Sequence, residues 1–102
     1  MSGNPSVVDN PQLGEQVRQV IAEVLVTSLE EVQPGRALVR DLGAESLDFL
    51  DLVFRLEDVL GRKIPFARWQ QFLKVELEAQ DLAVAITPEV VQRFAEQEAA
   101  RV

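Results

Sequence analysis

Apolar residues in the middle of the chain recur at the spacing of an amphipathic helix. Between residues 46 and 60 they stand one to three positions apart and together mark one face: Leu47, Leu50, Val53, Phe54, Leu56, Val59 and Leu60. A helix with one such face must pack it against other elements. Gly61 follows directly, and a glycine readily adopts the left-handed conformation that ends a helix. Residues 46–60 are therefore predicted to form a core helix.

Three further segments show a helical period, and two of them have a clear start signal. Asn10 and Pro11 can cap and begin a first helix that ends near Ser28. Thr87, followed by a proline and an acid, gives the same signal ahead of the last helix. The predicted helices cover residues 11–28, 46–60, 66–79 and 88–100. The predicted fold class is an all-α, four-helix bundle.

The connections between these helices differ in length. Residues 29–44 contain proline and glycine and are predicted to form a long loop, a feature that is often functional in a small domain. Four apolar residues can hold this loop on the core: Val32, Leu38, Val39 and Leu42. Ile64 and Pro65 break the chain after the second helix. Residues 80–87 include an alternating stretch that fits either an extended segment or a helix, so their structure is left open.

The composition excludes several classes of function. A net charge of −7 disfavours a nucleic-acid partner and favours basic protein surfaces. The chain has no cysteine and no histidine, so neither catalysis by its own groups nor a metal site is expected. Residues 1–10 resemble no targeting peptide, and no apolar run reaches the roughly 20 residues of a membrane span, which predicts a cytoplasmic protein. We expect a flexible tail over 1–10 and one monomeric domain over 11–102.

Ser46 stands at the start of the predicted core helix, just after Gly43 in the loop. A serine at this place can cap the helix or carry a group. It has no histidine to activate it, and the Gly-x-Ser-x-Gly sequence of hydrolases is absent. A phosphate on its hydroxyl would lie where a helix N-terminus stabilises an anion by about 0.3–1 kcal/mol. Ser46 therefore suits a phosphate-linked group that another enzyme attaches.

The run Asp-Leu-Gly-Ala-Glu-Ser-Leu-Asp over residues 41–48, with the acidic helix and Ile-Pro after it, resembles the acyl carrier proteins. The resemblance covers about residues 13–98 and implies that Ser46 carries 4′-phosphopantetheine, transferred from coenzyme A by a phosphopantetheinyl transferase. It further implies a discrete carrier, not an enzyme, that holds acyl groups as thioesters in fatty-acid or specialised lipid biosynthesis. Two residues depart from the family pattern: Glu45 replaces an aspartate, and Arg55 interrupts the acidic stripe.

The resemblance also implies a docking surface on the second helix. Five acidic residues would contact basic patches of acyl synthases and acyltransferases: Glu45, Asp48, Asp51, Glu57 and Asp58. A solvated helix face is the alternative interpretation, and Arg55 can pair with Asp51 or Asp58 at helical spacing.

The density of aromatic residues suggests an acyl pocket between the second and third helices. Its candidate lining residues are Phe49, Leu52, Val53, Phe54, Phe66, Trp69 and Phe72. Ordinary core packing is an equally good interpretation of Phe66, Trp69 and Phe72.

The sequence leaves alternatives open for the kind of carrier. A weaker similarity, carried by residues 46–54, 63–65 and Trp69, is to specialised carriers of very-long-chain acyl groups in lipid A synthesis. A peptidyl, aminoacyl or polyketide carrier would use the same serine, although the acidic second helix favours the acyl type. A helical adaptor whose serine is never modified is an alternative of another class.

Overall fold

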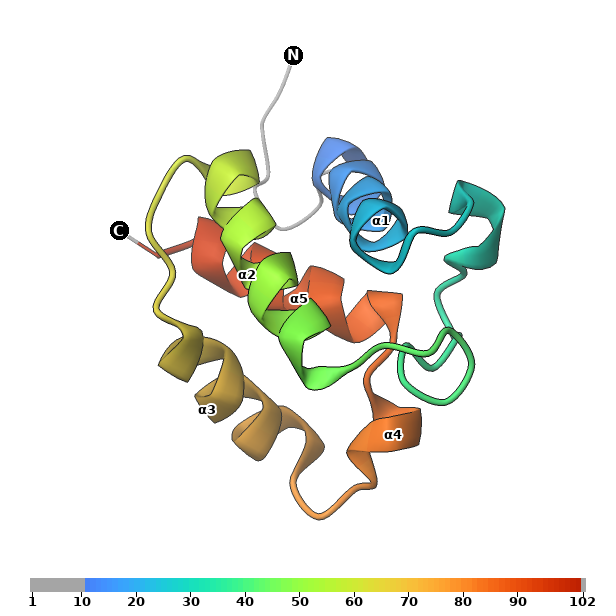
Figure 1. The fold of residues 1–102 in the computed structure, drawn as a ribbon. Helices are drawn as coiled ribbons and strands as arrows, with labels where there is room; N and C mark the ends of the chain where they lie inside the picture. Colours follow the sequence, from blue (N-terminus) through green and yellow to red (C-terminus); the bar gives the residue numbers. More distant parts are fainter. Residues whose placement is uncertain (1–10, 102) are drawn as a thin grey trace.

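Helices make up the regular structure of residues 11–101, which are the residues that this computed structural model describes (Figure 1). They are α1 (Pro11–Leu25), the short 3₁₀ helix η1 (Leu29–Glu31), α2 (Ser46–Leu60), α3 (Phe66–Leu77), α4 (Leu82–Ala85) and α5 (Pro88–Ala99). No strand occurs within this range, so the predicted all-α fold class is confirmed. None of these helices is long and apolar enough to cross a membrane. The predicted tail over residues 1–10 lies outside the described residues.

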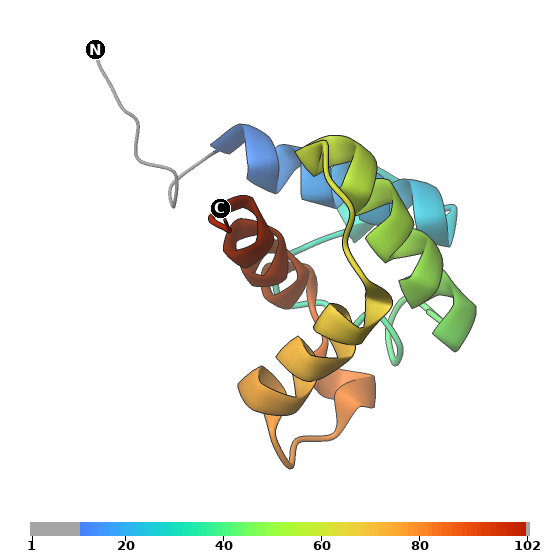
Figure 2. The ribbon, with the colours of Figure 1, turned by 90° about the vertical axis from the view of Figure 1, so that its left-hand side faces the viewer.

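The helices form a bundle in which α1 packs against both α2 and α5. Figures 1 and 2 show α5 running between the α1–α2 pair and α3, with α3 and α4 closing the far side. The bounds of α2 agree with the prediction, and α5 ends one residue earlier than predicted. α3 ends two residues earlier than predicted. Residues 80–87, which the sequence left open, contain the four-residue helix α4.

Local signals account for most helix ends. Gly61 has a left-handed backbone with φ of 69°, and its N–H donates to the carbonyl of Glu57 at 2.8 Å, which confirms the predicted end of α2. The hydroxyl of Thr87 accepts the N–H of Val90 at 3.3 Å and caps α5 as predicted. α4 begins with a similar contact, because the carboxylate of Asp81 accepts the N–H of Ala83 at 3.0 Å.

The end of α1 does not follow this pattern. Val26 adopts a left-handed backbone with φ of 53°, and the N–H of Thr27 donates to the carbonyl of Ala22 at 2.9 Å. Glycine usually fills this position, because an L-residue in the left-handed conformation costs about 1–2 kcal/mol and a β-branched one is an outlier. α1 therefore ends at Leu25, three residues before the predicted Ser28. The side chain of Val26 is 89% exposed, so little packing offsets this cost.

Replacing Val26 with glycine is expected to stabilise the protein by about 1 kcal/mol, because the left-handed strain disappears. The midpoint of urea unfolding should rise while the slope of the transition stays unchanged. Val75→Gly is the matched control, since Val75 is also exposed but lies in α3 without a left-handed backbone. That change should lower stability by roughly 1 kcal/mol. A loss of stability in both variants would contradict the strain at Val26.

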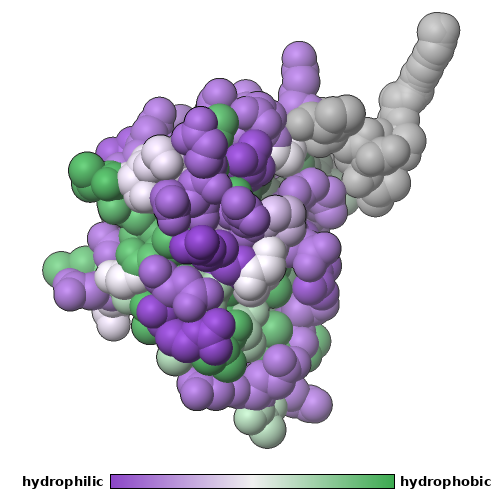
Figure 3. Space-filling view, turned by 90° about the vertical axis from the view of Figure 1, so that its right-hand side faces the viewer, coloured by the Kyte–Doolittle hydropathy of each residue, from purple (hydrophilic) through white to green (hydrophobic). Residues whose placement is uncertain are grey.

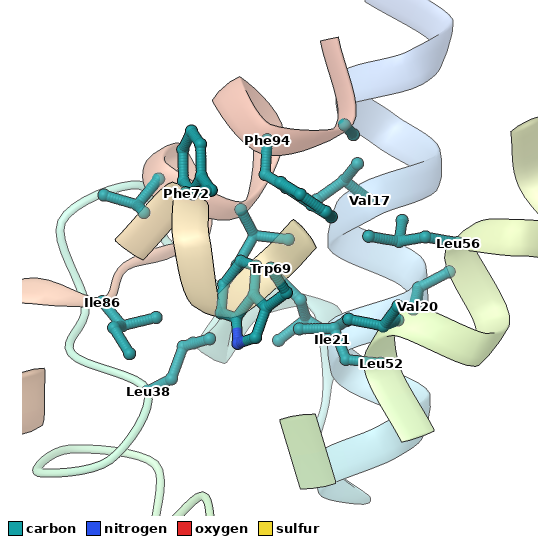
Figure 4. Packing of buried hydrophobic residues seen from close by; sticks show 14 of the residues in the cluster. Val17, Val20, Ile21, Leu38, Leu52, Leu56, Trp69, Phe72, Ile86 and Phe94 are labelled. Carbon is teal, nitrogen blue, oxygen red and sulfur yellow. The ribbon is translucent and has the colours of Figure 1, made fainter. Parts of the chain in front are cut away.

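The core is centred on aromatic rings contributed by α3 and α5 (Figure 4). The ring centroids of Trp69 and Phe94 are 5.2 Å apart, and those of Phe72 and Phe94 are also 5.2 Å apart. Phe49 of α2 stacks on Trp69 at 5.9 Å. α3 is thus held to the other helices by buried aromatic contacts.

The long loop between α1 and α2 is fixed at both ends. The guanidinium of Arg18 in α1 donates to the carbonyls of Leu29 at 2.9 Å and Val32 at 3.0 Å. Further along, the N–H of Leu38 donates to the carbonyl of Ile86 at 2.9 Å. The four apolar residues predicted to pin the loop are buried or partly buried against the core: Val32, Leu38, Val39 and Leu42. These contacts therefore fix the position of residues 41–46 relative to the helices.

Candidate functional site

Ser46 is the first residue of α2, and it lies exposed on the surface. The N-cap is Glu45, whose N–H donates to the carboxylate of Asp48 at 2.8 Å. Capping is thus performed by the flanking acids, and the interpretation of Ser46 as the N-cap is wrong. Ser46 lies in the first turn of α2, where a helix N-terminus stabilises an anion. Its position fits a phosphodiester.

The residues before Ser46 have structural roles of their own. Gly43 has φ of 77°, a left-handed turn that only glycine adopts without strain. The carboxylate of Asp41 accepts the N–H of Ala37 at 3.0 Å and pairs with Arg40 at 3.0 Å. The hydrogen bond from Arg40, and then that from Ala37, lower the pKa of the Asp41 carboxyl. At pH values above its ordinary pKa, the ionised Asp41 carboxylate stabilises this turn. This stabilisation is lost only as the pH falls through the lowered pKa of Asp41.

Ser46 lies at an open groove of about 730 Å³ that is bounded by α2, α3, α4 and the long loop. Its apolar lining consists of Val39, Phe49, Phe66, Trp69, Leu73, Leu82 and Ile86. Its polar lining consists of Ser46, Gln70, Lys74, Glu78 and Gln80. A chain attached at Ser46 can therefore reach a mainly apolar surface without crossing the protein.

The structure brings together only part of the predicted pocket. Phe49, Phe66 and Trp69 line the groove. Leu52 and Val53 do not; they are buried in the core, since their face of α2 belongs to the contact of this helix with the bundle. The sequence did not predict that residues of the loop and α4 line the groove, because their position depends on backbone contacts between distant segments.

Two predicted pocket residues point elsewhere. Phe54 is 57% exposed and lies outside the groove, because it falls on the solvent face of α2. Phe72 is buried against Phe94 of α5, on a different face of α3 from the groove. Contrary to the prediction, these two rings therefore do not line the groove.

The predicted docking acids differ in whether their carboxylates already form hydrogen bonds or ion pairs within the protein. The carboxylate of Asp48 caps α2, and that of Glu57 accepts the N–H of Ile64 at 2.8 Å. Asp51 pairs with Arg55 at 3.3 Å, which is one of the two pairings expected from the sequence. Glu45 and Asp58 are exposed, and within residues 11–101 the Asp58 side chain forms no hydrogen bond or ion pair.

Arg55 also forms an ion pair that the sequence did not predict. Its guanidinium lies 3.1 Å from the carboxylate of Glu23 in α1, so that it bridges two acids on two helices. Glu23 is 32 residues away in the chain, and no local pattern signals the contact.

Comparison with known proteins places this site in a family. Residues 15–76, which include Ser46, match the family described as phosphopantetheine attachment site. An acyl carrier protein of Nitratidesulfovibrio vulgaris is 40% identical over 62 residues, 61% of this chain and 82% of that protein. Acyl carrier protein AcpXL of Rhizobium meliloti is 40% identical over 57 residues, 56% of this chain and 60% of that protein. The corresponding protein of Brucella melitensis is 39% identical over 57 residues, 56% of this chain and 61% of that protein. The chain thus spans about three-fifths of the length of these AcpXL relatives. It belongs to the acyl carrier protein family, whose prosthetic group is phosphopantetheine.

Proposed function

We propose that this chain is a discrete acyl carrier in which the Ser46 hydroxyl bears 4′-phosphopantetheine. The observation that carries the proposal is the position of Ser46, which is exposed, free of the helix cap and at the edge of an apolar groove. Bound there, the group would supply a flexible arm that ends in a thiol for acyl thioesters. The chain itself is the substrate of a phosphopantetheinyl transferase, acyl synthases and acyltransferases, and it is not an enzyme.

The transfer of phosphopantetheine to Ser46, here called loading, needs little from this chain beyond an accessible oxygen. Ser46 Oγ attacks the phosphorus that is bonded to pantetheine in the diphosphate of coenzyme A, the P–O bond within the diphosphate breaks, and adenosine 3′,5′-bisphosphate leaves. The serine proton passes to a base of the transferase, since this chain has no histidine to accept it. The N-terminus of α2, where Ser46 lies, would favour the negative charge of a phosphate held there.

The groove supports an apolar acyl group as the cargo. The groove-lining residues of α3 extend from Phe66 to Lys74, about 12 Å of helix at 1.5 Å per residue. Burial of a hydrocarbon chain against this surface would contribute about 0.8 kcal/mol of binding free energy for each methylene group removed from water. Together with the similarity to AcpXL proteins, this favours a specialised carrier of very-long-chain acyl groups.

The proposal is tested by incubating the protein with coenzyme A and a broad-specificity phosphopantetheinyl transferase. Intact mass spectrometry should show the gain of one phosphopantetheine per chain. A known acyl carrier protein treated in parallel shows that the transferase is active. If that control gains mass and this chain does not, the carrier function is refuted.

A further inference from the structure

A second, smaller cleft of about 150 Å³ lies between α3 and the end of α5, and it shares no lining residue with the groove beside Ser46. Its polar lining consists of Arg68, Gln71, Glu76, Gln97, Glu98 and Arg101. We propose that this cleft binds a phosphate group that still carries a proton, either as free phosphate or at the end of a phosphate monoester. Binding here is independent of the carrier chemistry proposed at Ser46.

The cleft contains a buried carboxylate, that of Glu98, which is only 1% exposed. Its Oε2 atom lies 3.1 Å from Nε of Arg68 and 3.1 Å from Nε of Arg101. Its Oε1 atom is buried and accepts no hydrogen bond from the residues that the structure describes. A buried acceptor without a donor is costly, so Oε1 marks a place for a donor that these residues do not supply.

The two guanidinium groups beside this carboxylate still have donors to offer. Within residues 11–101 the Nη atoms of Arg68 and Arg101 donate no hydrogen bond. The side chains of Arg68 and Arg101 are 34% and 49% exposed, so a ligand can approach them from solvent. Arg62 donates to the carbonyls of Glu98 at 2.8 Å and Arg101 at 2.9 Å. The backbone that carries Glu98 and Arg101 is therefore fixed by a third arginine.

Arginines of the long loop are arranged differently. The side of the molecule that carries η1 and α4 is largely hydrophilic (Figure 3). In the loop, Arg36 pairs with Glu31 at 3.0 Å and Arg40 pairs with Asp41 at 3.0 Å, so each positive charge has an acid of its own. These acids are accessible to water, and neither pair contains a buried oxygen that lacks a partner. Such surface pairs need no ligand.

The charges of the cleft favour an anion. Arg68 and Arg101 contribute two positive charges and Glu98 one negative charge, which leaves one positive charge over. The other acid of the cleft, Glu76, is paired with Arg93 at 2.7 Å. Guanidinium groups bind the oxygens of phosphate well, because several N–H donors match them in one plane.

The free acceptor of Glu98 decides which anion fits. A phosphate that carries a proton accepts from the guanidinium groups through its oxygens and donates its P–O–H hydrogen to Glu98 Oε1. Because Oε1 is buried, the half-exposed Arg101 side chain must turn with the ligand for this contact to form. Sulfate has similar oxygens but no proton near neutral pH, so it would meet the carboxylate as a second acceptor. The cleft should therefore prefer phosphate to sulfate.

Titration of the unmodified full chain, followed by the NMR shifts of its backbone amides, tests the site. At about pH 6 roughly half of a phosphate monoester is protonated. Inorganic phosphate should shift the amides of residues 68–76 and 97–101 in a saturable way. Its Kd should be about tenfold or more lower than that of sulfate, although sulfate carries the greater charge. Glycerol 3-phosphate separates the two sources of the group, since it shifts the same amides only if the cleft admits an ester.

Three variants assign the roles of the residues. Glu98→Gln should bind both anions with a Kd ratio of about one, because the carboxylate that rejects sulfate is gone. Arg101→Gln should weaken phosphate binding about tenfold or more, and it should stay folded because Arg101 is half exposed and follows the end of α5. Arg36→Gln is the matched control, since it makes the same change at an ion-paired arginine outside the cleft, and its Kd should equal that of the wild type.

Three results would overturn the site: no saturable shift with phosphate, equal affinity of the wild type for phosphate and sulfate, or shifts confined to the start of α2. The first is expected if water alone satisfies Glu98 Oε1, because a chain with a net charge of −7 otherwise repels anions. None of these results bears on the loading of Ser46, which intact mass measures separately.

Discussion

Ser46→Ala is expected to abolish loading with phosphopantetheine and to leave the fold unchanged. Loading fails because the variant lacks the only oxygen that could form the phosphodiester at this site, so no mass gain should appear where the wild type is fully converted. Stability should change by less than about 0.5 kcal/mol, because the Ser46 side chain is exposed and takes no part in the helix cap. Intact mass spectrometry and urea unfolding of the same preparation check both statements.

Asp48→Ala is the control that separates a carrier serine from a capping one. This change removes the 2.8 Å hydrogen bond to the N–H of Glu45, which should cost about 1 kcal/mol of stability. It leaves Ser46 in place, so loading should still occur. If Ser46→Ala destabilised the protein as much as Asp48→Ala, Ser46 would be structural, and if it still gained mass, another residue would carry the group.

Helix ends with a strong local signal could be read from the sequence, whereas ends without one could not. Gly61 and Thr87 act through their own backbone or side chain, so their residue types predicted the end of α2 and the start of α5. Val26 shows no such signal, because valine at φ of 53° runs against its preference. α4 has a local start signal in Asp81, but its place against the long loop is marked by the backbone contact between Leu38 and Ile86, which are far apart in the chain.

The candidate site likewise has a part with a local sequence signal and a part without one. The motif around Ser46 is local, and the sequence placed it at the start of α2. The groove is assembled from segments distant in the chain, so the contribution of Val39 and Leu82 depends on the tertiary fold. Nine apolar residues of α2 surround much of the helix, and periodicity alone could not show that Phe54 faces solvent.

Phe94→Ala is expected to destabilise the protein by about 3–5 kcal/mol, the usual effect of truncating a buried aromatic residue. Phe94 of α5 is fully buried, and its ring lies 5.2 Å from both Trp69 and Phe72 of α3. The cavity left behind would remove the contact that joins α3 to α5, and the packing of α3 also shapes the groove beside Ser46. The loss is a large share of the roughly 5–15 kcal/mol that keeps a typical domain folded. Urea unfolding followed by the fluorescence of Trp69, the only tryptophan, measures it directly.

Phe54→Ala makes the same chemical change at an exposed position and isolates the effect of burial. Phe54 is 57% exposed, so its truncation should change stability by less than about 1 kcal/mol. Both variants keep Ser46, and the phenyl ring removed is identical. A similar loss in both would show that Phe54 packs against the protein rather than facing solvent. A small loss for Phe94→Ala would show that α3 is held by contacts other than the aromatic cluster.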